Sequence, residues 1–99
     1  MDGLIEGRIV HYVLTESDVD AITKSRMLNP VAKQGNSVLP GLHFPAIVVR
    51  VFPQEFGSDN PGVNLQVFLD GNDSLWVTSR KFAVPEVLEN GTWHWIEKA

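Results

Sequence analysis

One stretch of the chain, from Val63 to Arg80, constrains the fold more than any other, because two alternating runs flank a cluster of turn formers. Alternation of apolar and polar residues is typical of a half-buried β-strand. Asp70-Gly71-Asn72-Asp73 lies between the two runs and favours a tight reversal of the chain. The stretch therefore predicts a β-hairpin with the loop 71–73. The residues that this loop pairs are Leu69 with Leu75, Val67 with Val77, Phe68 with Trp76, Gln66 with Thr78, and Asn64 with Arg80.

The predicted hairpin has one aliphatic face and one face that is polar and aromatic. A second strand, 45–52, extends the sheet if Val51 pairs with Val63, because the aliphatic faces of the two strands then coincide. We expect the aliphatic face to form the core, with Ile47, Val49, Val51, Leu65, Val67, Leu69, Leu75 and Val77 pointing inward. The outer face then carries the candidate ligand-binding residues Arg50, Asn64, Gln66, Phe68, Trp76, Thr78 and Arg80.

The rest of the chain predicts further short strands and one helix. The segment 7–14 alternates as a strand, and Thr15 with Asp18 fits the capping box that begins a helix. The helix should end near Leu28, because the next residue precedes a proline. Loops are predicted at 29–44 and 53–62, and a last strand at 92–97. We expect a single domain, 1–99, of the mainly β, small α+β class: an SH3-like bent antiparallel sheet or barrel of about five strands, with one helix after the first strand.

Composition excludes several classes of partner. The formal net charge of −4 disfavours nucleic acid, since a phosphate backbone is bound by a basic surface. The chain contains no cysteine, which excludes disulfides and thiolate metal sites. It has no run of about 18 apolar residues and no signal-peptide pattern, so we expect no membrane contact and a cytoplasmic location.

Catalytic motifs are missing from the sequence. No serine stands in a G-x-S-x-G elbow, and the serines lie in predicted caps, turns and strand ends. His11, His43 and His94 lack the short spacings of metal ligands, so we expect them to lie apart as partly exposed or hydrogen-bonded side chains. Turn geometry accounts for Asp70 and Asp73 without an acid–base role. We therefore expect no enzyme activity, no catalytic residue, no metal site and no cofactor.

Binding chemistry is better represented, on the predicted outer face. Phe68 and Trp76 can stack on a planar ring, while the arginine, amide and hydroxyl groups can hydrogen-bond an anion or the edge of a base. The same two aromatics could instead form a stabilising cross-strand pair or a subunit interface. Trp93 and Trp95 are expected to plug the end of the barrel. The small core has too little volume to bury all four of these aromatic side chains, which predicts an exposed apolar patch. Such patches usually mark contacts, so we expect a homo-oligomer.

Four segments of the chain together resemble a family of short SH3-like proteins of unassigned role that tailed bacteriophages and prophages encode. The segments are G-R-I-V-H-Y-V at 7–13, F-P-A-I-V-V-R-V-F at 44–52, V-N-L-Q-V-F-L-D-G-N-D-S-L-W-V-T-S at 63–79 and G-T-W-H-W at 91–95. The resemblance implies a phage origin and an SH3-like fold, and it transfers no catalytic residue. We then expect a non-catalytic accessory protein in the host cytoplasm, an anti-defence sponge that sequesters a nucleotide-type immune signalling molecule. The alternative is a virion or assembly component that acts through protein–protein contacts.

Overall fold

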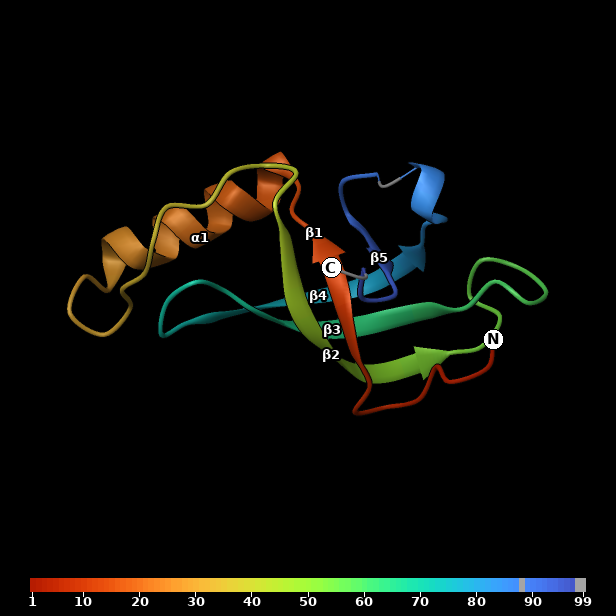
Figure 1. The fold of residues 1–99 in the computed structure, drawn as a ribbon. Helices are drawn as coiled ribbons and strands as arrows, with labels where there is room; N and C mark the ends of the chain where they lie inside the picture. Colours follow the sequence, from red (N-terminus) through yellow and green to blue (C-terminus); the bar gives the residue numbers. More distant parts are fainter. Residues whose placement is uncertain (88, 98–99) are drawn as a thin grey trace.

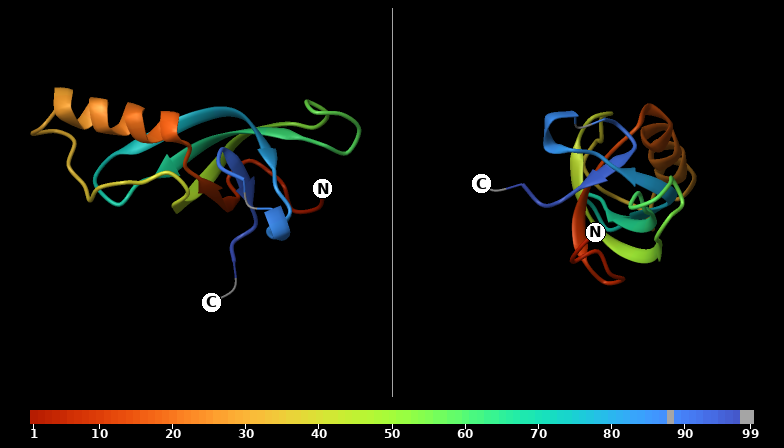
Figure 2. Two further views of the ribbon diagram at one scale, coloured as in Figure 1. Left: turned by 90° about the horizontal axis from the view of Figure 1, so that it is seen from above. Right: turned by 90° about the vertical axis from the view of Figure 1, so that its right-hand side faces the viewer.

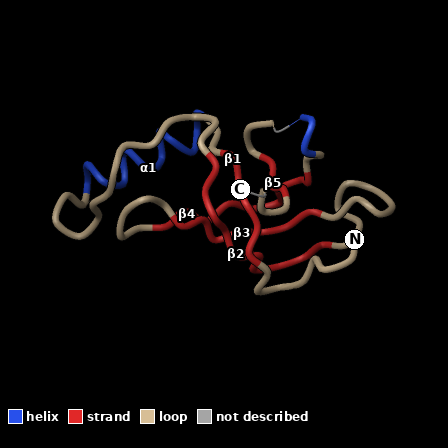
Figure 3. The backbone as a smooth tube through the Cα atoms, viewed as in Figure 1, coloured by secondary structure: helices blue, strands red, loops and turns tan. Residues whose placement is uncertain are grey.

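The computed structural model describes residues 1–87 and 89–97, and the strands within them close into a barrel (Figures 1 and 3). The strands are β1 (Ile9–Val13), β2 (His43–Phe52), β3 (Gly62–Phe68), β4 (Ser74–Phe82) and β5 (Thr92–His94). The helix α1 (Glu16–Leu28) follows β1, and a short 3-10 helix, η1 (Pro85–Val87), precedes β5. The barrel closes because β5 pairs with β1 on one side and with β4 on the other. This arrangement confirms the predicted fold class and is consistent with an SH3-like barrel.

Local sequence signals define both ends of α1. The Thr15 hydroxyl oxygen accepts a hydrogen bond from the Asp18 backbone N–H at 2.9 Å, and the Asp18 carboxylate accepts one from the Thr15 N–H at 2.9 Å. This reciprocal pair is the predicted capping box. The helix ends at Leu28, also as predicted. Among the described residues, no helix combines the length and the apolar character that crossing a membrane would need.

The core lies inside the barrel and receives apolar side chains from all the strands. Its fully buried members include Val10, Tyr12, Val48, Val63, Leu65, Val67 and Trp93. Of the residues predicted to face inward, Leu65, Val67, Leu69 and Val77 are buried, while Val51 and Leu75 are half-buried and pack against the core. Of the two tryptophans predicted to plug the end of the barrel, Trp93 is fully buried in the core, and Trp95 is half-buried and packs edge-to-face against it.

The predicted face of the first half of β2 is wrong, because the strand contains a β-bulge at Val49. From Arg50 onward, β2 pairs with β3 as predicted. On the other side of Val49, Leu65 pairs with Val48 instead of the predicted Val49, so Val49 is an extra residue without a partner in β3. The bulge turns Ala46 and Val48 inward, and both are fully buried. Ile47 and Val49 point outward instead, and Val49 is 49% exposed.

The β3–β4 hairpin forms, but its residue pairs differ from the predicted ones. The last pair before the turn is Phe68 with Ser74, so the loop is 69–73 and is longer than predicted. Gln66 lies opposite Trp76. This register differs by two residues from the predicted one, and a shift of two keeps each side chain on its face. Near the turn the predicted faces are therefore right although the predicted pairs are wrong.

Contacts with the loop after α1 hold the tip of this hairpin. Gly35 and Gly71 form an isolated β-bridge, and the Asn36 N–H donates a hydrogen bond to the Asp70 carbonyl oxygen at 2.7 Å. The helix and the hairpin tip project from the barrel on the same side (Figures 1 and 2). The molecule is therefore elongated, with extents of 44 × 24 × 22 Å.

Candidate functional site

The outer side of β3 and β4 carries two exposed aromatic side chains, as predicted. Trp76 is 61% exposed, and Phe68 is exposed two residue pairs closer to the turn. The two rings are diagonal neighbours, so the predicted direct Phe68–Trp76 pair is wrong. Within the described part of the chain, neither ring contacts another aromatic ring or a cationic side chain. Both rings are therefore open to a partner.

Two of the predicted polar site residues, Asn64 and Gln66, hold the hairpin together. The Asn64 side-chain oxygen accepts a hydrogen bond from the Ser79 backbone N–H at 2.9 Å. The Gln66 side-chain amide donates one to the Ser74 hydroxyl oxygen at 2.8 Å. Each side chain is half-buried and keeps only part of its hydrogen-bonding capacity for a ligand.

Arg50 and Thr78 are the polar site residues that remain exposed on this side. The Arg50 guanidinium lies over the Phe52 ring, with its central carbon 5.2 Å from the ring centroid. A cation–π contact of this kind positions the guanidinium without using its N–H donors. Arg50 is therefore the group on this side best suited to bind an anion.

The predicted place of Arg80 on the outer side is wrong. Ser79 has a φ of 54° at a second bulge, and the register shifts there so that Arg80 pairs with Val63. The Arg80 guanidinium carbon lies 5.7 Å from the centroid of the Tyr12 ring, and a guanidinium nitrogen lies 3.9 Å from the Asp18 carboxylate. The Tyr12 hydroxyl donates a hydrogen bond to the same carboxylate at 2.6 Å, and burial together with this bond raises the pKa of that hydroxyl. Arg80 thus belongs to a network beneath the start of α1.

The bulge in β2 makes the outer side more apolar than predicted. Ile9, Ile47, Gln66 and Trp76 follow one another as paired residues across β1, β2, β3 and β4. The outside of a closed barrel is convex, whereas small-molecule sites are concave, so this side cannot enclose a small ligand by itself. We name as the aromatic face the outward side chains Ile47, Val49, Arg50, Gln66, Phe68, Trp76 and Thr78.

The three histidines meet at one carboxylate, so the expectation that they lie apart is wrong. His11 and His94 lie opposite each other in the β1–β5 pair, and His43 comes from the neighbouring strand β2. Glu97, which follows β5, contacts all three imidazole rings. The potential ligand atoms of these four residues lie within 4.8 Å of one another. We name this group the histidine cluster.

A single oxygen of Glu97, Oε1, faces the imidazole nitrogens. It lies 3.4 Å from Nδ1 of His11 and 3.0 Å from Nδ1 of His43, and it also contacts Nε2 of His94. Burial lowers the pKa of His94; the charge of Glu97 acts to raise it, and His43 and His11 lower it further. Burial acts to raise the pKa of Glu97, but its contacts with His43 and His11 outweigh burial and hold the pKa below its usual value. Burial thus favours the neutral form of His94, and the contacts with the histidines favour the ionised form of Glu97.

Barrel closure, rather than spacing along the chain, creates the histidine cluster. His11 precedes the buried Tyr12 and His94 follows the buried Trp93, so both histidines lie on the outer side of their strands. That alternation is readable from the sequence. The pairing of β1 with β5, which places the two rings side by side, depends on contacts between the two ends of the chain and leaves no local signal.

Asp70 and Asp73 have structural partners near the hairpin tip. Arg26 donates two hydrogen bonds to the Asp73 carboxylate, each at 2.9 Å. The Asn36 side-chain amide donates one to the Asp70 carboxylate at 2.9 Å. These contacts fasten the hairpin to the loop after α1.

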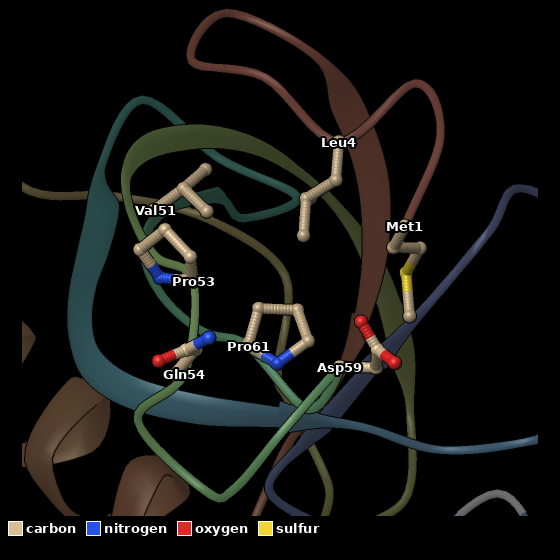
Figure 4. Close-up of a pocket in the computed structure, with 7 residues that line it drawn as sticks. All are labelled: Met1, Leu4, Val51, Pro53, Gln54, Asp59 and Pro61. Carbon is tan, nitrogen blue, oxygen red and sulfur yellow. The ribbon is translucent and has the colours of Figure 1, made fainter.

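A pocket lies at the end of the barrel away from α1, between the N-terminal segment and the β2–β3 loop (Figure 4). Its lining residues are Met1, Leu4, Val51, Pro53, Gln54, Asp59 and Pro61. Most of these side chains are apolar, and Asp59 is the one carboxylate among them. The lining brings together no pair of side chains that acid–base chemistry would need.

Comparison of the chain with protein-family models, with curated proteins and with solved structures finds no match. The resemblance to phage-encoded proteins therefore stays a prediction. The assignment of sites depends on the geometry of the aromatic face and of the histidine cluster.

Proposed function

We propose that the protein is a non-catalytic binding protein that associates with a second copy of itself through the aromatic face and holds a planar, nucleotide-type ligand between the two copies. The observation that carries this proposal is Trp76, a large aromatic that is 61% exposed within β4, on a side of the sheet that also carries outward aliphatic side chains. Tryptophan and arginine are enriched at the energetic centres of protein interfaces. The exposed Trp76 fits such a centre, and Arg50 is exposed on the same side of the sheet, farther along β2.

The convex shape of the aromatic face is the reason for proposing a second surface. A ligand that stacks on Trp76 alone leaves its other side in water. Two aromatic faces that approach each other would cover both sides of a planar ring and would bury Ile47 and Val49 as well. A two-fold arrangement of this kind repeats each contact, as in most homodimers.

The chemistry of the aromatic face suits a nucleotide-type ligand. Trp76 and Phe68 offer ring surfaces for stacking, and Arg50 offers a guanidinium for a phosphate. The predicted phage origin suggests the role of a sponge, which would bind a signalling nucleotide of the host and release it unchanged.

Contact with a different protein, as in a virion or assembly component, is the second candidate function. The outward positions of Ile47 and Val49 favour it, because aliphatic side chains add contact area for a protein surface and no specific interaction with a nucleotide.

Native mass spectrometry of the purified protein tests the proposal, since it reports the oligomer and any retained small molecule together. Stacking of a base on an aromatic ring contributes about 1–3 kcal/mol, so Trp76→Ala should weaken ligand binding roughly 5- to 150-fold. Met27→Ala removes another exposed apolar side chain, 75% exposed on α1, and serves as the matched control. Circular dichroism of both variants serves to check that they fold.

We expect a dimer that releases an intact nucleotide on heating, and we expect both properties to weaken in Trp76→Ala but not in Met27→Ala. Recovery of a cleaved ligand would show that the protein is an enzyme and would contradict the proposal that it binds without catalysis. A dimer without any ligand, sensitive to Trp76→Ala, would favour the assembly role. A monomer that retains nothing at any concentration would refute both candidates.

A further inference from the structure

The histidine cluster has the arrangement of a metal-binding site. Its four side chains come from three neighbouring strands, β5, β1 and β2, and from the segment after β5. The strands are joined by backbone hydrogen bonds, so the positions of His11, His43 and His94 are set by the barrel itself. Ligands that a rigid sheet holds in place bind an ion without a large loss of side-chain entropy.

Distances within the cluster match the spacing of ligands around a small divalent ion. Zinc binds imidazole nitrogen at about 2.0–2.1 Å, and the corners of a tetrahedron of that size are about 3.4 Å apart. Glu97 Oε1 lies 3.4 Å from His11 Nδ1 and 3.0 Å from His43 Nδ1. All four potential ligand atoms fall within 4.8 Å of one another, so one ion can reach them with small side-chain movements.

Hydrogen bonding inside the cluster leaves a polar atom without a partner. Within residues 1–87 and 89–97, His11 Nδ1 is buried and makes no hydrogen bond, since the Glu97 oxygen that faces it lies 3.4 Å away. A buried polar nitrogen without a partner is unfavourable, and an ion at the centre of the cluster would give its lone pair one. Three imidazole rings also share one carboxylate oxygen, whereas an ion would give each ring nitrogen a separate bond.

We infer that His11, His43, His94 and Glu97 bind one divalent transition-metal ion, and that the ion which fits them best is Zn²⁺. Three imidazole nitrogens and one carboxylate oxygen form a donor set that zinc accepts in tetrahedral geometry. Calcium and magnesium prefer a shell of oxygen ligands, so they suit this set poorly. This site is separate from the aromatic face, and the inference does not depend on the proposed function.

The four protein ligands would fill a tetrahedral shell, which points to a structural ion rather than a catalytic one. The site lies where the barrel closes, and the closing strand β5 is only three residues long. An ion held by His94 and Glu97 on one side of this seam and by His11 and His43 on the other would fasten β5 to the barrel. His11 and His43 are partly exposed, so an ion can enter from solvent.

One difference from ordinary metal sites concerns the second nitrogen of His94. Metal-bound imidazoles usually donate their other N–H to a carboxylate or carbonyl group. His94 Nδ1 is buried and has no hydrogen-bond partner within the described residues. The ring is instead held by edge-to-face packing, with His43 at 4.8 Å and His11 at 5.8 Å between ring centroids.

Metal titration of protein that carries no polyhistidine tag and has been treated with a chelator tests the inference. Isothermal titration with ZnCl₂ should show one ion per chain, and Co²⁺ should give the intense visible absorption of a four-coordinate site. At a hundredfold excess of free zinc over its Kd, the Tm should rise by roughly 10–20 °C. A chelator should reverse the rise.

Replacing His94 would risk unfolding the chain, because its side chain is almost fully buried. The test therefore changes His43 and Glu97, whose side chains are partly exposed. His43→Ala and Glu97→Gln should each weaken zinc binding tenfold or more and abolish the cobalt absorption. Glu86→Gln, the same change at an exposed glutamate outside the cluster, should leave both unchanged. Zinc binding that survives His43→Ala and Glu97→Gln, or no binding up to millimolar zinc, would overturn the inference.

Discussion

At the scale of single residues, the Arg26–Asp73 ion pair is the side-chain contact that joins α1 to the hairpin tip. Two nitrogens of Arg26 donate to the two carboxylate oxygens of Asp73, and a third donates to the Asn36 carbonyl oxygen at 2.7 Å. Both charged side chains are largely buried. A bidentate, partly buried pair stabilises a protein more than a mobile surface pair does. The hydrogen bonds from Arg26 hold the pKa of the Asp73 carboxyl below its usual value.

Asp73→Asn should lower the free energy of unfolding by about 1.5–3 kcal/mol at neutral pH, because it leaves the Arg26 charge without its partner. The pKa of Asp73 is lower in the folded than in the unfolded protein. Its contribution is therefore complete above the unfolded pKa and is lost as the pH falls through the folded pKa. Urea unfolding at a series of pH values should show the two proteins converging in acid.

Asp20→Asn, at an exposed carboxylate of the same helix, is the control and should change stability by less than about 0.5 kcal/mol. A difference between Asp73→Asn and the parent protein that stays constant down to strongly acidic pH would contradict the assignment of the ion pair.

At the scale of elements, two bulges explain where the sequence predicted the structure and where it did not. Alternation placed the strands and the core face of β3 correctly, because Leu65, Val67 and Leu69 all follow one period. It could not reveal the extra residue Val49, because valine suits either side of a strand equally well. Ser79 carries no pattern that marks a positive φ. The sequence therefore predicted the aromatic residues of the aromatic face, Phe68 and Trp76, but not its aliphatic residues, Ile47 and Val49.

A pair of neighbouring substitutions tests the bulge in β2. Val48 is fully buried and Val49 is 49% exposed, although the sequence alone predicts the reverse. Val48→Asp should lower the free energy of unfolding by about 4 kcal/mol or more, because it buries a charge without a partner. Val49→Asp should change it by about 0.5 kcal/mol or less. Thermal unfolding, followed by circular dichroism, measures the stability of both variants. If Val49→Asp lowers the stability more than Val48→Asp does, the bulge is wrongly placed.

A glycine contact tests how the hairpin tip packs against the loop after α1. A Cβ atom added to Gly71 would lie 2.5 Å from the Gln34 carbonyl oxygen and 2.6 Å from the Gly35 Cα atom. Gly71→Ala should therefore push the hairpin tip away from the loop after α1 and lower stability by about 1–3 kcal/mol. Amide hydrogen exchange should speed up at Asn36, whose N–H is bonded to Asp70. Unchanged exchange there and unchanged stability would show that this contact does not hold the hairpin tip against the loop.

At the scale of the whole molecule, the outside of the barrel carries two separate candidate sites. The histidine cluster lies over β5, β1 and β2, and the aromatic face lies over β2, β3 and β4. The sequence indicated the aromatic face because a hairpin places its residues locally. It did not indicate the histidine cluster, because that site forms only when the two ends of the chain meet. Each candidate site has a tryptophan on it or next to it, Trp76 for the aromatic face and Trp95 for the histidine cluster, so the signals of these two side chains can report on the two sites separately.

The central claim, that the aromatic face is the binding surface, is tested most directly by the indole N–H signals in a ¹H–¹⁵N spectrum. Trp76 is exposed on that face, Trp93 is buried in the core, and Trp95 follows the cluster residue His94. Raising the protein concentration from micromolar to millimolar should shift the Trp76 signal and leave the Trp93 signal in place. Adding zinc should shift the Trp95 signal instead. A Trp76 signal that keeps its position over the whole concentration range would contradict self-association through the aromatic face.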